Sequence, residues 1–343
     1  MQLFRLRFLP RSSWRTPWEA DTIFGLLCWA CARKDGDSRL RQEIIDPSLA
    51  GEPPFVVSDA FPTGWMPAPV VLRDSGYLEH YKKLAPTLIK RVRKARWLSE
   101  DGFAGFQRGE VPPAADFATH EPIKGFGEIN NQISRETNTT SSGRGPFVSE
   151  SWTLSDGNQE KGMSIYVRTT AGYTGRFNDL FRELSLSGFG ADVSVGKGEF
   201  EVSSELEPYP RLDQVDGPNA SIVLSTFQPS RNDPTEGLWE SIVKYGKLGS
   251  DFGLDNVFKR PMILFRPGAL LVSRRDWFGR ALGMSEFLEP SVVAHLESQQ
   301  IRVMHPAFGL AVPVELLSAE RSYLVTVREP SERLSHEGGF VSL

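Results

Sequence analysis

Apolar and polar residues alternate at the start of the chain, and this pattern predicts a strand followed by a helix. The segment LFRLRF (3–8) turns its apolar side chains to one face and two arginines, Arg5 and Arg7, to the other, where they meet either water or RNA. The apolar stretch IFGLLCWACA then predicts a helix from about Thr22, with Asp21 and Thr22 as candidate caps.

A second helix is predicted from about Gly175 to Leu186, because its apolar residues recur at i, i+3, i+4 and i+7. The glycine-rich segment GFGADVSVGKG (188–198) joins it to an alternating strand, EFEVS. Upstream, residues 55–71 and 162–170 also read as strands, the first interrupted by prolines. This order is that of a ferredoxin-like βαββαβ unit, so the predicted fold class is α+β.

Residues 75–150 form a predicted insertion, basic at first and then rich in Gly, Asn, Thr and Ser. Its basic part, Lys82 to Ser99, holds seven Lys or Arg and no acidic residue, which is typical of an RNA contact or of a solvated helix face. Further along, near-alternating segments flank a turn at 140–143, so residues 129–152 are expected to form a protruding hairpin.

A proline- and acid-rich segment at 205–219 separates a first domain, 1–205, from a second, 206–330, and residues 331–343 read as a tail. The second domain is expected to be mostly β with one weakly helical segment around 290–299. Its predicted strands lie in SIVLSTFQPS (221–230), PMILFRPGALLV (261–272) and HPAFGLAVPVEL (305–316).

Composition limits the classes of function. With 343 residues, of which 40% are hydrophobic and 24% charged, the chain is long enough for two domains. No apolar run reaches membrane-spanning length and the first residues lack a signal peptide, so a cytoplasmic location without membrane contact is expected. A net charge of −4 argues against a general nucleic-acid scavenger, so any RNA site must be local.

The glycine-rich segment does not match a nucleotide-binding sequence motif. Gly190 and Gly196 are separated by five residues where a Walker loop has four, and the segment runs from helix to strand, the reverse of the nucleotide motifs. Lys197 is followed by Gly198 where a Walker loop has Ser or Thr. Its glycines can still expose N–H groups beside Ser194 and Lys197 to a phosphodiester chain, and a flexible turn is the alternative.

Catalytic and metal-binding patterns are missing from the sequence. Cys28 and Cys31 have CxxC spacing but fall inside an apolar helix, so they are expected to be core residues. The five histidines show no metal-ligand spacing, and no metal or cofactor is expected. His80 and His120 remain possible general bases, although a histidine in a polar insertion is more often only solvated.

Several segments together resemble the RAMP superfamily of CRISPR proteins. Within it, they are similar to the family of fourth subunits of type III-A (Csm) effector complexes, which bind the 5′ handle of the guide RNA (crRNA). The resemblance extends from residue 1 to about 330, and one departure is Asp192, where family loops often carry a basic residue. The segments are DTIFGLLCWA (21–30), VSDAFPTGWMPAP (57–69), NNQISRETNTT (130–140), GFGADVSVGKGEF (188–200), SIVLSTFQPS (221–230) and HPAFGLAVPV (305–314).

The resemblance implies two ferredoxin-like domains and a non-catalytic subunit that caps the crRNA 5′ handle. It also implies contacts with a large polymerase-like subunit, with a backbone RAMP subunit and, through a thumb-like hairpin, with target RNA near the handle junction. RAMP nucleases usually need a histidine near the first helix, and residues 11–33 contain none.

The candidate RNA-binding residues come from four segments: the first strand, the basic run, the hairpin and the glycine-rich segment. They are Arg5, Arg7, Arg11, Lys90, Arg91, Arg93, Lys94, Asn131, Ile133, Ser134, Arg135, Thr137, Gly188, Gly190, Ser194, Gly196, Lys197 and Gly198.

Three other functions remain open on the sequence. The chain could be a RAMP endoribonuclease that processes CRISPR precursor RNA, a structural subunit without RNA contact, or the equivalent subunit of a type III-B or III-D complex.

Overall fold

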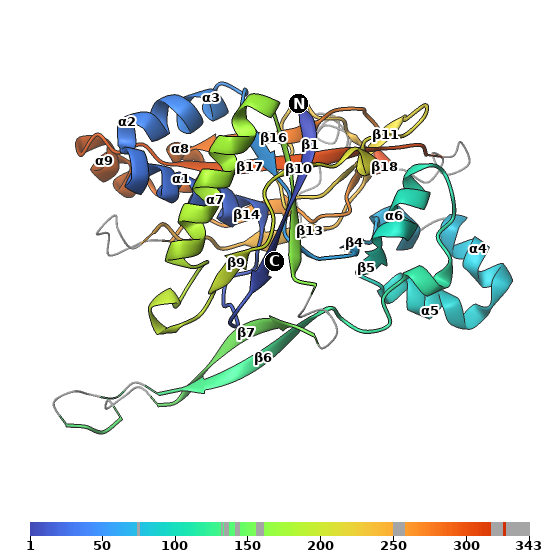
Figure 1. Ribbon diagram of the computed structural model, residues 1–343, viewed down its shortest axis with the longest axis horizontal. Helices are drawn as coiled ribbons and strands as arrows, with labels where there is room; N and C mark the ends of the chain where they lie inside the picture. Colours follow the sequence, from blue (N-terminus) through green and yellow to red (C-terminus); the bar gives the residue numbers. More distant parts are fainter. Residues whose placement is uncertain are drawn as a thin grey trace, which may run out of the picture.

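The computed structural model describes residues 1–73, 76–131, 133, 137–140, 145–155, 161–249, 258–316 and 325–326. Two β-sheets with helices along them form the body, and one long hairpin projects from it (Figure 1). Within the described residues, no helix is long and apolar enough to cross a membrane.

The first sheet has the strand order of a ferredoxin-like unit. All of its pairings are antiparallel, and β1 lies between β8 on one side and β9 and β10 on the other, with β2 and β3 beyond β8. The predicted βαββαβ order is therefore confirmed. Its elements are β1 (Gln2–Pro10), α1 (Ala20–Asp35), β2 (Phe55–Val57), β3 (Phe61–Pro62), β8 (Met163–Thr169), α7 (Thr174–Ser187), β9 (Phe200–Val202) and β10 (Glu207–Pro208).

Helices α1 and α7 lie side by side along this sheet (Figure 1). The alternation of β1 buries Leu6 and Phe8, and the Phe8 ring lies 5.8 Å from that of Phe181 on α7. This burial of large apolar side chains between sheet and helix is the main stabilising contribution of the layer. Short turns continue the helical layer after α1, namely α2 (Asp37–Leu40), the π-helix η1 (Arg41–Ile45) and α3 (Asp46–Leu49).

The second sheet has the strand order β16-β17-β11-β15-β12-β18. The described part of the chain after residue 219 is mostly β, as expected from the sequence. The strands β13 and β14 form a separate antiparallel pair. The bounds are β11 (Ala220–Val223), β12 (Glu236–Leu238), β13 (Ser241–Lys244), β14 (Met262–Phe265), β15 (Leu270–Leu271), β16 (Trp277–Gly283), α8 (Met284–Phe287), α9 (Pro290–Ser298), β17 (Met304–Val314) and β18 (Val325–Thr326).

The start of the insertion is folded into the core, which the sequence did not predict. Tyr81, Phe106 and Phe117 are buried there, and the Tyr81 hydroxyl donates to Pro112 O. The sequence pattern was misleading because the helices expose a dense row of cations beside a narrow apolar stripe. The insertion is preceded by β4 (Trp65–Pro67) and η2 (Val70–Arg73). Its first elements are α4 (Gly76–Leu84), α5 (Pro86–Lys94), β5 (Trp97–Ser99), α6 (Glu100–Gln107) and η3 (Ala114–Asp116).

The predicted hairpin is confirmed and is longer than expected. Its strands are β6 (Ile123–Asn130) and β7 (Phe147–Leu154), paired from Ile123 with Leu154 to Asn130 with Phe147. In Figure 1, β6 and β7 join the body at one end of the hairpin and point away from it.

A buried carboxylate, Asp59, ties the two sheets and α1 together. Its Oδ1 accepts hydrogen bonds from Ala20 N at 2.9 Å and Thr226 N at 2.8 Å, and its Oδ2 accepts from Thr226 Oγ1 at 2.7 Å. The N-terminal N–H of α1 is thus capped from a distant segment. The predicted caps are wrong, since the N-cap residue is Glu19 and Asp21 lies in the first turn, paired with Lys244.

Burial, with a contribution from Glu19, raises the pKa of Asp59 to about 7 from 3.8, against the hydrogen bonds that favour the ionised form. A carboxyl with a raised folded-state pKa contributes its stability fully below the unfolded value and loses it as the pH rises through the folded value. We therefore expect the free energy of unfolding of the wild type, relative to that of Asp59→Asn, to fall between pH 4 and pH 7 in urea titrations.

Asp59→Ala is the matched comparison. It removes the acceptor for two buried N–H groups, and we expect it to cost about 2–4 kcal/mol of stability, whereas Asp59→Asn retains an acceptor. Equal stabilities of the two variants would contradict the role given to these hydrogen bonds.

Candidate nucleic-acid interface

The loop after β1, residues 11–19, connects the glycine-rich segment to the hairpin. Trp14 N donates to Trp152 O at 3.0 Å and Trp152 N donates to Trp14 O at 2.8 Å. The loop therefore forms an antiparallel bridge with β7. On its other side, Gly198 N donates to Ser13 O at 2.9 Å, and the Trp18 ring stacks on Phe189 with centroids 3.5 Å apart. Three segments that are distant in sequence therefore form one unit.

The glycine-rich segment is held in left-handed conformations that its glycines permit. A Cβ at Gly198, where φ is +69°, would lie 2.0 Å from Phe189 O, and one at Gly190, where φ is +79°, would lie 2.5 Å from Thr16 Cβ. At Gly196, where φ is +85°, a Cβ would meet nothing within 4 Å. The close approaches are thus within the protein, and Gly188 (φ 78°) ends α7.

Most backbone N–H groups of this segment donate within the protein, contrary to the open nest expected from the sequence. Lys197 N, for example, donates to Asp192 O at 3.2 Å, and Ala191 N to Thr16 Oγ1 at 2.9 Å. Ser194 lies on the exposed outer turn, η5 (Val193–Val195). The cationic side chains are therefore the stronger candidates for a phosphate contact.

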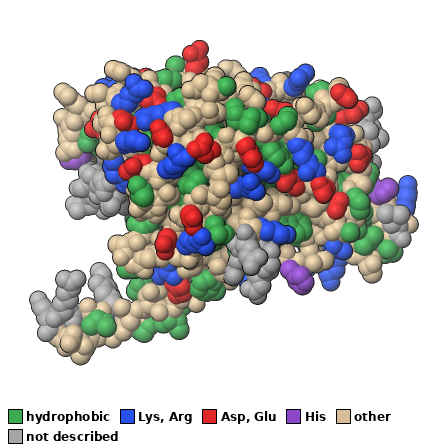
Figure 2. Space-filling model, viewed as in Figure 1, with side chains coloured by type: hydrophobic (Ala, Val, Ile, Leu, Met, Phe, Trp, Pro, Cys, Tyr) green, Lys and Arg blue, Asp and Glu red, His purple; other side chains and the backbone are tan. Residues whose placement is uncertain are grey.

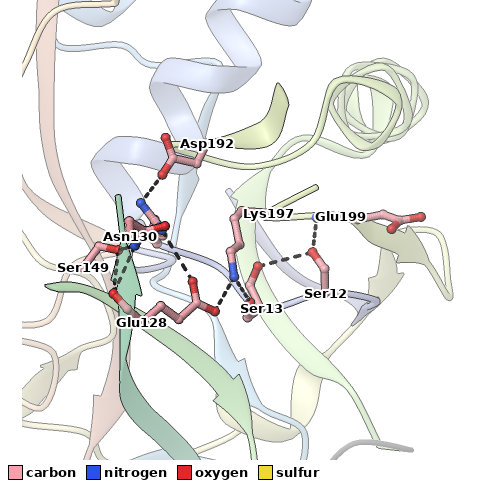
Figure 3. A network of polar contacts seen from close by, with 9 residues as sticks. Ser12, Ser13, Glu128, Asn130, Ser149, Asp192, Lys197 and Glu199 are labelled. Carbon is pink, nitrogen blue, oxygen red and sulfur yellow. Dashed lines mark hydrogen bonds and ion pairs between the residues drawn. The ribbon is translucent and has the colours of Figure 1, made fainter. Parts of the chain in front are cut away.

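Two cations and two carboxylates join the segment to the hairpin (Figure 3). Lys197 Nζ lies 2.5 Å from Glu128 Oε1 and donates to Ser13 Oγ at 2.8 Å. Arg15 pairs with Asp192 and lies 3.4 Å from Glu128 Oε2. Hydrogen bonds from Lys197 and Arg15 lower the pKa of Glu128, so this carboxyl stays ionised at neutral pH.

The arginines of β1, and Arg11 directly after it, lie beside acidic side chains. Arg5 donates to Glu207 at 2.7 Å and stacks on the Tyr209 ring at 4.2 Å. Arg11 pairs with Glu201, and Arg7, which is partly exposed, lies 4.0 Å from Glu207. An RNA that binds here must compete with these carboxylates, so the platform is weaker than the sequence indicated.

The cations of α5 differ from those of β1 because no acidic side chain among the described residues pairs with them, whereas Arg7 and Arg11 are exposed but lie beside carboxylates. Lys90, Arg93 and Lys94 face outward, while Arg91 donates to Phe117 O at 2.8 Å and is partly buried. Figure 2 shows that elsewhere on the visible face of the body Lys and Arg lie among Asp and Glu.

The candidate residues of the hairpin tip are only partly described. Asn131 Nδ2 donates to Thr140 Oγ1 at 3.0 Å, Ile133 is exposed and bridges to Thr140, and the Thr137 and Thr139 hydroxyls are 2.9 Å apart. Ser134 and Arg135 lie outside the described residues.

The structure brings a histidine to the first helix, although none is near it in the sequence. His305 on β17 places its Nε2 3.7 Å from Asp21 Oδ2 and its Nδ1 3.1 Å from Lys259 Nζ. It is only 2% exposed, and burial together with Lys259 lowers its pKa to about 3. The imidazole is therefore neutral and closed to solvent, unlike an RNA-cleaving base.

The fold matches chains from solved type III-A assemblies. A chain of the Csm1-Csm4 cassette in complex with AMPPNP matches over 93% of this chain and 100% of its own, with 18% identity and a TM-score of 0.61, as does one from the cassette with cA4. A chain of the Csm3-Csm4 subcomplex in the type III-A CRISPR-Cas interference complex matches over 92% and 100%, with 10% identity and a TM-score of 0.52. Csm4 is common to these assemblies. The chain therefore has a Csm4-like fold.

The resemblance seen in the sequence is thus confirmed for the fold. No protein-family model and no curated protein sequence matches the chain. In this Csm4-like fold, sequence reasoning missed Arg15 and Glu128, because their partners are 177 and 69 residues away and no local pattern marks them.

The crowding around Gly198 generates a test of the glycine-rich segment. Gly198→Ala should lower the midpoint of thermal unfolding well beyond Gly196→Ala, since both residues have left-handed φ but only Gly198 abuts a backbone carbonyl. Backbone strain alone costs about 1–2 kcal/mol, which is the loss expected for the Gly196→Ala control. Equal losses would show that the close approach to Phe189 is unimportant.

Proposed function

We propose that this protein is a non-catalytic, RNA-binding subunit of a type III-A CRISPR effector complex that caps the 5′ handle of the crRNA. The observation that carries the proposal is the match of 93% and 92% of the chain to chains of the Csm1-Csm4 and Csm3-Csm4 assemblies, respectively. A subunit that occurs in assemblies with Csm1 and with Csm3 fits a position between a large polymerase-like subunit and the RAMP backbone.

The distribution of cations supports a single-stranded RNA ligand. Exposed cations on α5 and the paired cations Arg15 and Lys197 offer separate phosphate contacts on a chain of net charge −4. A flexible single strand can follow separated contacts of this kind, because its backbone carries charge at every nucleotide.

Binding without cleavage is the activity that suits these residues. The buried, neutral His305 cannot take a proton from an RNA hydroxyl. His80 contacts the Tyr81 ring, and among the described residues no hydrogen bond or ion pair orients His80 or His120. Within the described residues, no group of three His, Cys, Asp or Glu side chains is placed to hold a metal ion.

The exposed cations of α5 provide the experiment. We expect the triple variant Lys90→Ala, Arg93→Ala and Lys94→Ala to reduce affinity for an RNA that begins with the handle. The slope of log affinity against log salt should also fall by about 0.7 for each phosphate that the variant no longer neutralises. Titrations by fluorescence anisotropy at several salt concentrations measure both quantities.

The control removes the same charge elsewhere, at exposed Lys34, Arg274 and Arg302. An equal change in both triple variants would show that only net charge matters, and no RNA binding by the wild type would refute the proposal. Gels of the same mixtures should show uncut RNA with and without Mg²⁺, and specific cleavage would refute the non-catalytic role.

An exposed apolar face supports a protein partner. Val243 on β13 and Ile263 on β14 lie directly opposite each other and are 55% and 61% exposed, and Tyr245 is exposed beside them. The opposite face of this strand pair packs on the core through Met262 and Leu264. Exposed apolar patches of this kind mark protein interfaces.

We expect Val243→Asp with Ile263→Asp to prevent co-purification with one of the two neighbouring subunits while RNA affinity is unchanged. A charge buried in an interface without a partner destabilises the complex strongly. Leu186→Asp, at an exposed position on α7, is the control. Retention of both subunits by the double variant would show that this face is not an interface.

A further inference from the structure

We propose that Glu128 occupies the position of an RNA phosphate in the free protein, and that the guide RNA displaces it and thereby releases the hairpin. The inference rests on the RNA-binding function proposed above. It assigns to Arg15, Lys197 and Ser13 a phosphate subsite that a hairpin carboxylate fills until RNA arrives.

The geometry of Glu128 is that of an anion held by two cations. Oε1 lies 2.5 Å from Lys197 Nζ and Oε2 lies 3.4 Å from Arg15 Nη2. The two non-bridging oxygens of a phosphodiester can make the same pair of contacts. Ser13 Oγ, 2.8 Å from Lys197 Nζ, adds a hydroxyl at the same place.

The carboxylates also explain why these cations are poor sites in the free chain. The side chains of Arg15 and Lys197 are each 16% exposed. Asp192 holds the other end of the Arg15 guanidinium. Of these two carboxylates, only Glu128 belongs to the projecting hairpin, so only its displacement frees a separate element (Figure 3).

Displacement of Glu128 would affect the outer part of the hairpin, because its base is held independently: Leu154 is buried in the core, and Ile123 and Trp152 pack against it. At its base, Trp152 pairs with Trp14 through the backbone. Further out, Glu128 and Asn130 reach the body, with Asn130 Oδ1 3.4 Å from Arg15 Nη2. RNA binding and hairpin freedom are then linked, and each must alter the other by the same factor.

The alternative role for Glu128 is to position Lys197 and Arg15 for RNA. The two roles predict opposite signs for Glu128→Gln. Removal of a competing carboxylate raises affinity for RNA, whereas removal of a positioning group lowers it.

The experiment measures affinity for a single-stranded RNA of mixed sequence by anisotropy. We expect Glu128→Gln to bind about two- to fivefold more tightly than the wild type, the range that one partly exposed ion pair can supply. Glu150→Gln, which removes the same charge from an exposed position on the same hairpin, should change affinity less than twofold. In a Lys197→Met background the gain from Glu128→Gln should shrink.

The second measurement follows the hairpin itself by pulsed electron paramagnetic resonance. Spin labels at Val148→Cys and Leu186→Cys, both exposed positions, are combined with Cys28→Ala; the remaining Cys31 is buried. We expect Glu128→Gln to broaden the distance distribution without RNA, and RNA to broaden that of the wild type.

Lower affinity of Glu128→Gln, or an unchanged distribution with RNA bound, would overturn the exchange. Failure of the wild type to bind any RNA would refute the proposed function instead. In that case, inorganic tripolyphosphate replaces RNA as the test anion. It must broaden the spin-label distance distribution of the wild type, and an unchanged distribution overturns the displacement of Glu128.

Discussion

The acceptance of three hydrogen bonds by the Asp59 carboxylate is the constraint on which the rest of the structure depends. It fixes the first N–H of α1 and the segment after β11 to the loop between β2 and β3. The neighbouring Ala60 N donates to Trp18 O at 2.8 Å, which sets where the loop 11–19 must end. Since Trp18 also stacks on Phe189, the contacts around Asp59 and Ala60 position the glycine-rich segment as well.

This order of dependence separates stability from binding. The buried groups around Asp59 carry no exposed charge, and burial keeps His305 neutral. The cations that can meet RNA lie further out, on the loop, the glycine-rich segment and α5. Charge removal at those outer positions should therefore alter binding with little loss of fold, because surface ion pairs contribute little to stability.

The sequence predicted the regular elements well and the polar contacts poorly. The alternation in 3–8, the helical spacing in 175–186 and the hairpin at 129–152 were confirmed because each depends on local periodicity. The sequence left open whether the basic run around α5 is a helix face, and α6 was not predicted because two glycines interrupt its short apolar pattern. Glu128, Arg15 and the Asp59 cap could not be predicted, because long-range contacts leave no local pattern and no single-sequence signal marks them.

The pairing of four cations with carboxylates changes what specificity can mean for this protein. A free cation attracts any anion, whereas a cation already bonded to a carboxylate is released only to a ligand that replaces both the charge and the geometry of that carboxylate. Arg5, Arg11, Arg15 and Lys197 are all of the second kind. An RNA that satisfies several such pairs together gains more than one that meets a single pair, so the mildly acidic chain can discriminate a defined RNA from other polyanions without base-specific contacts.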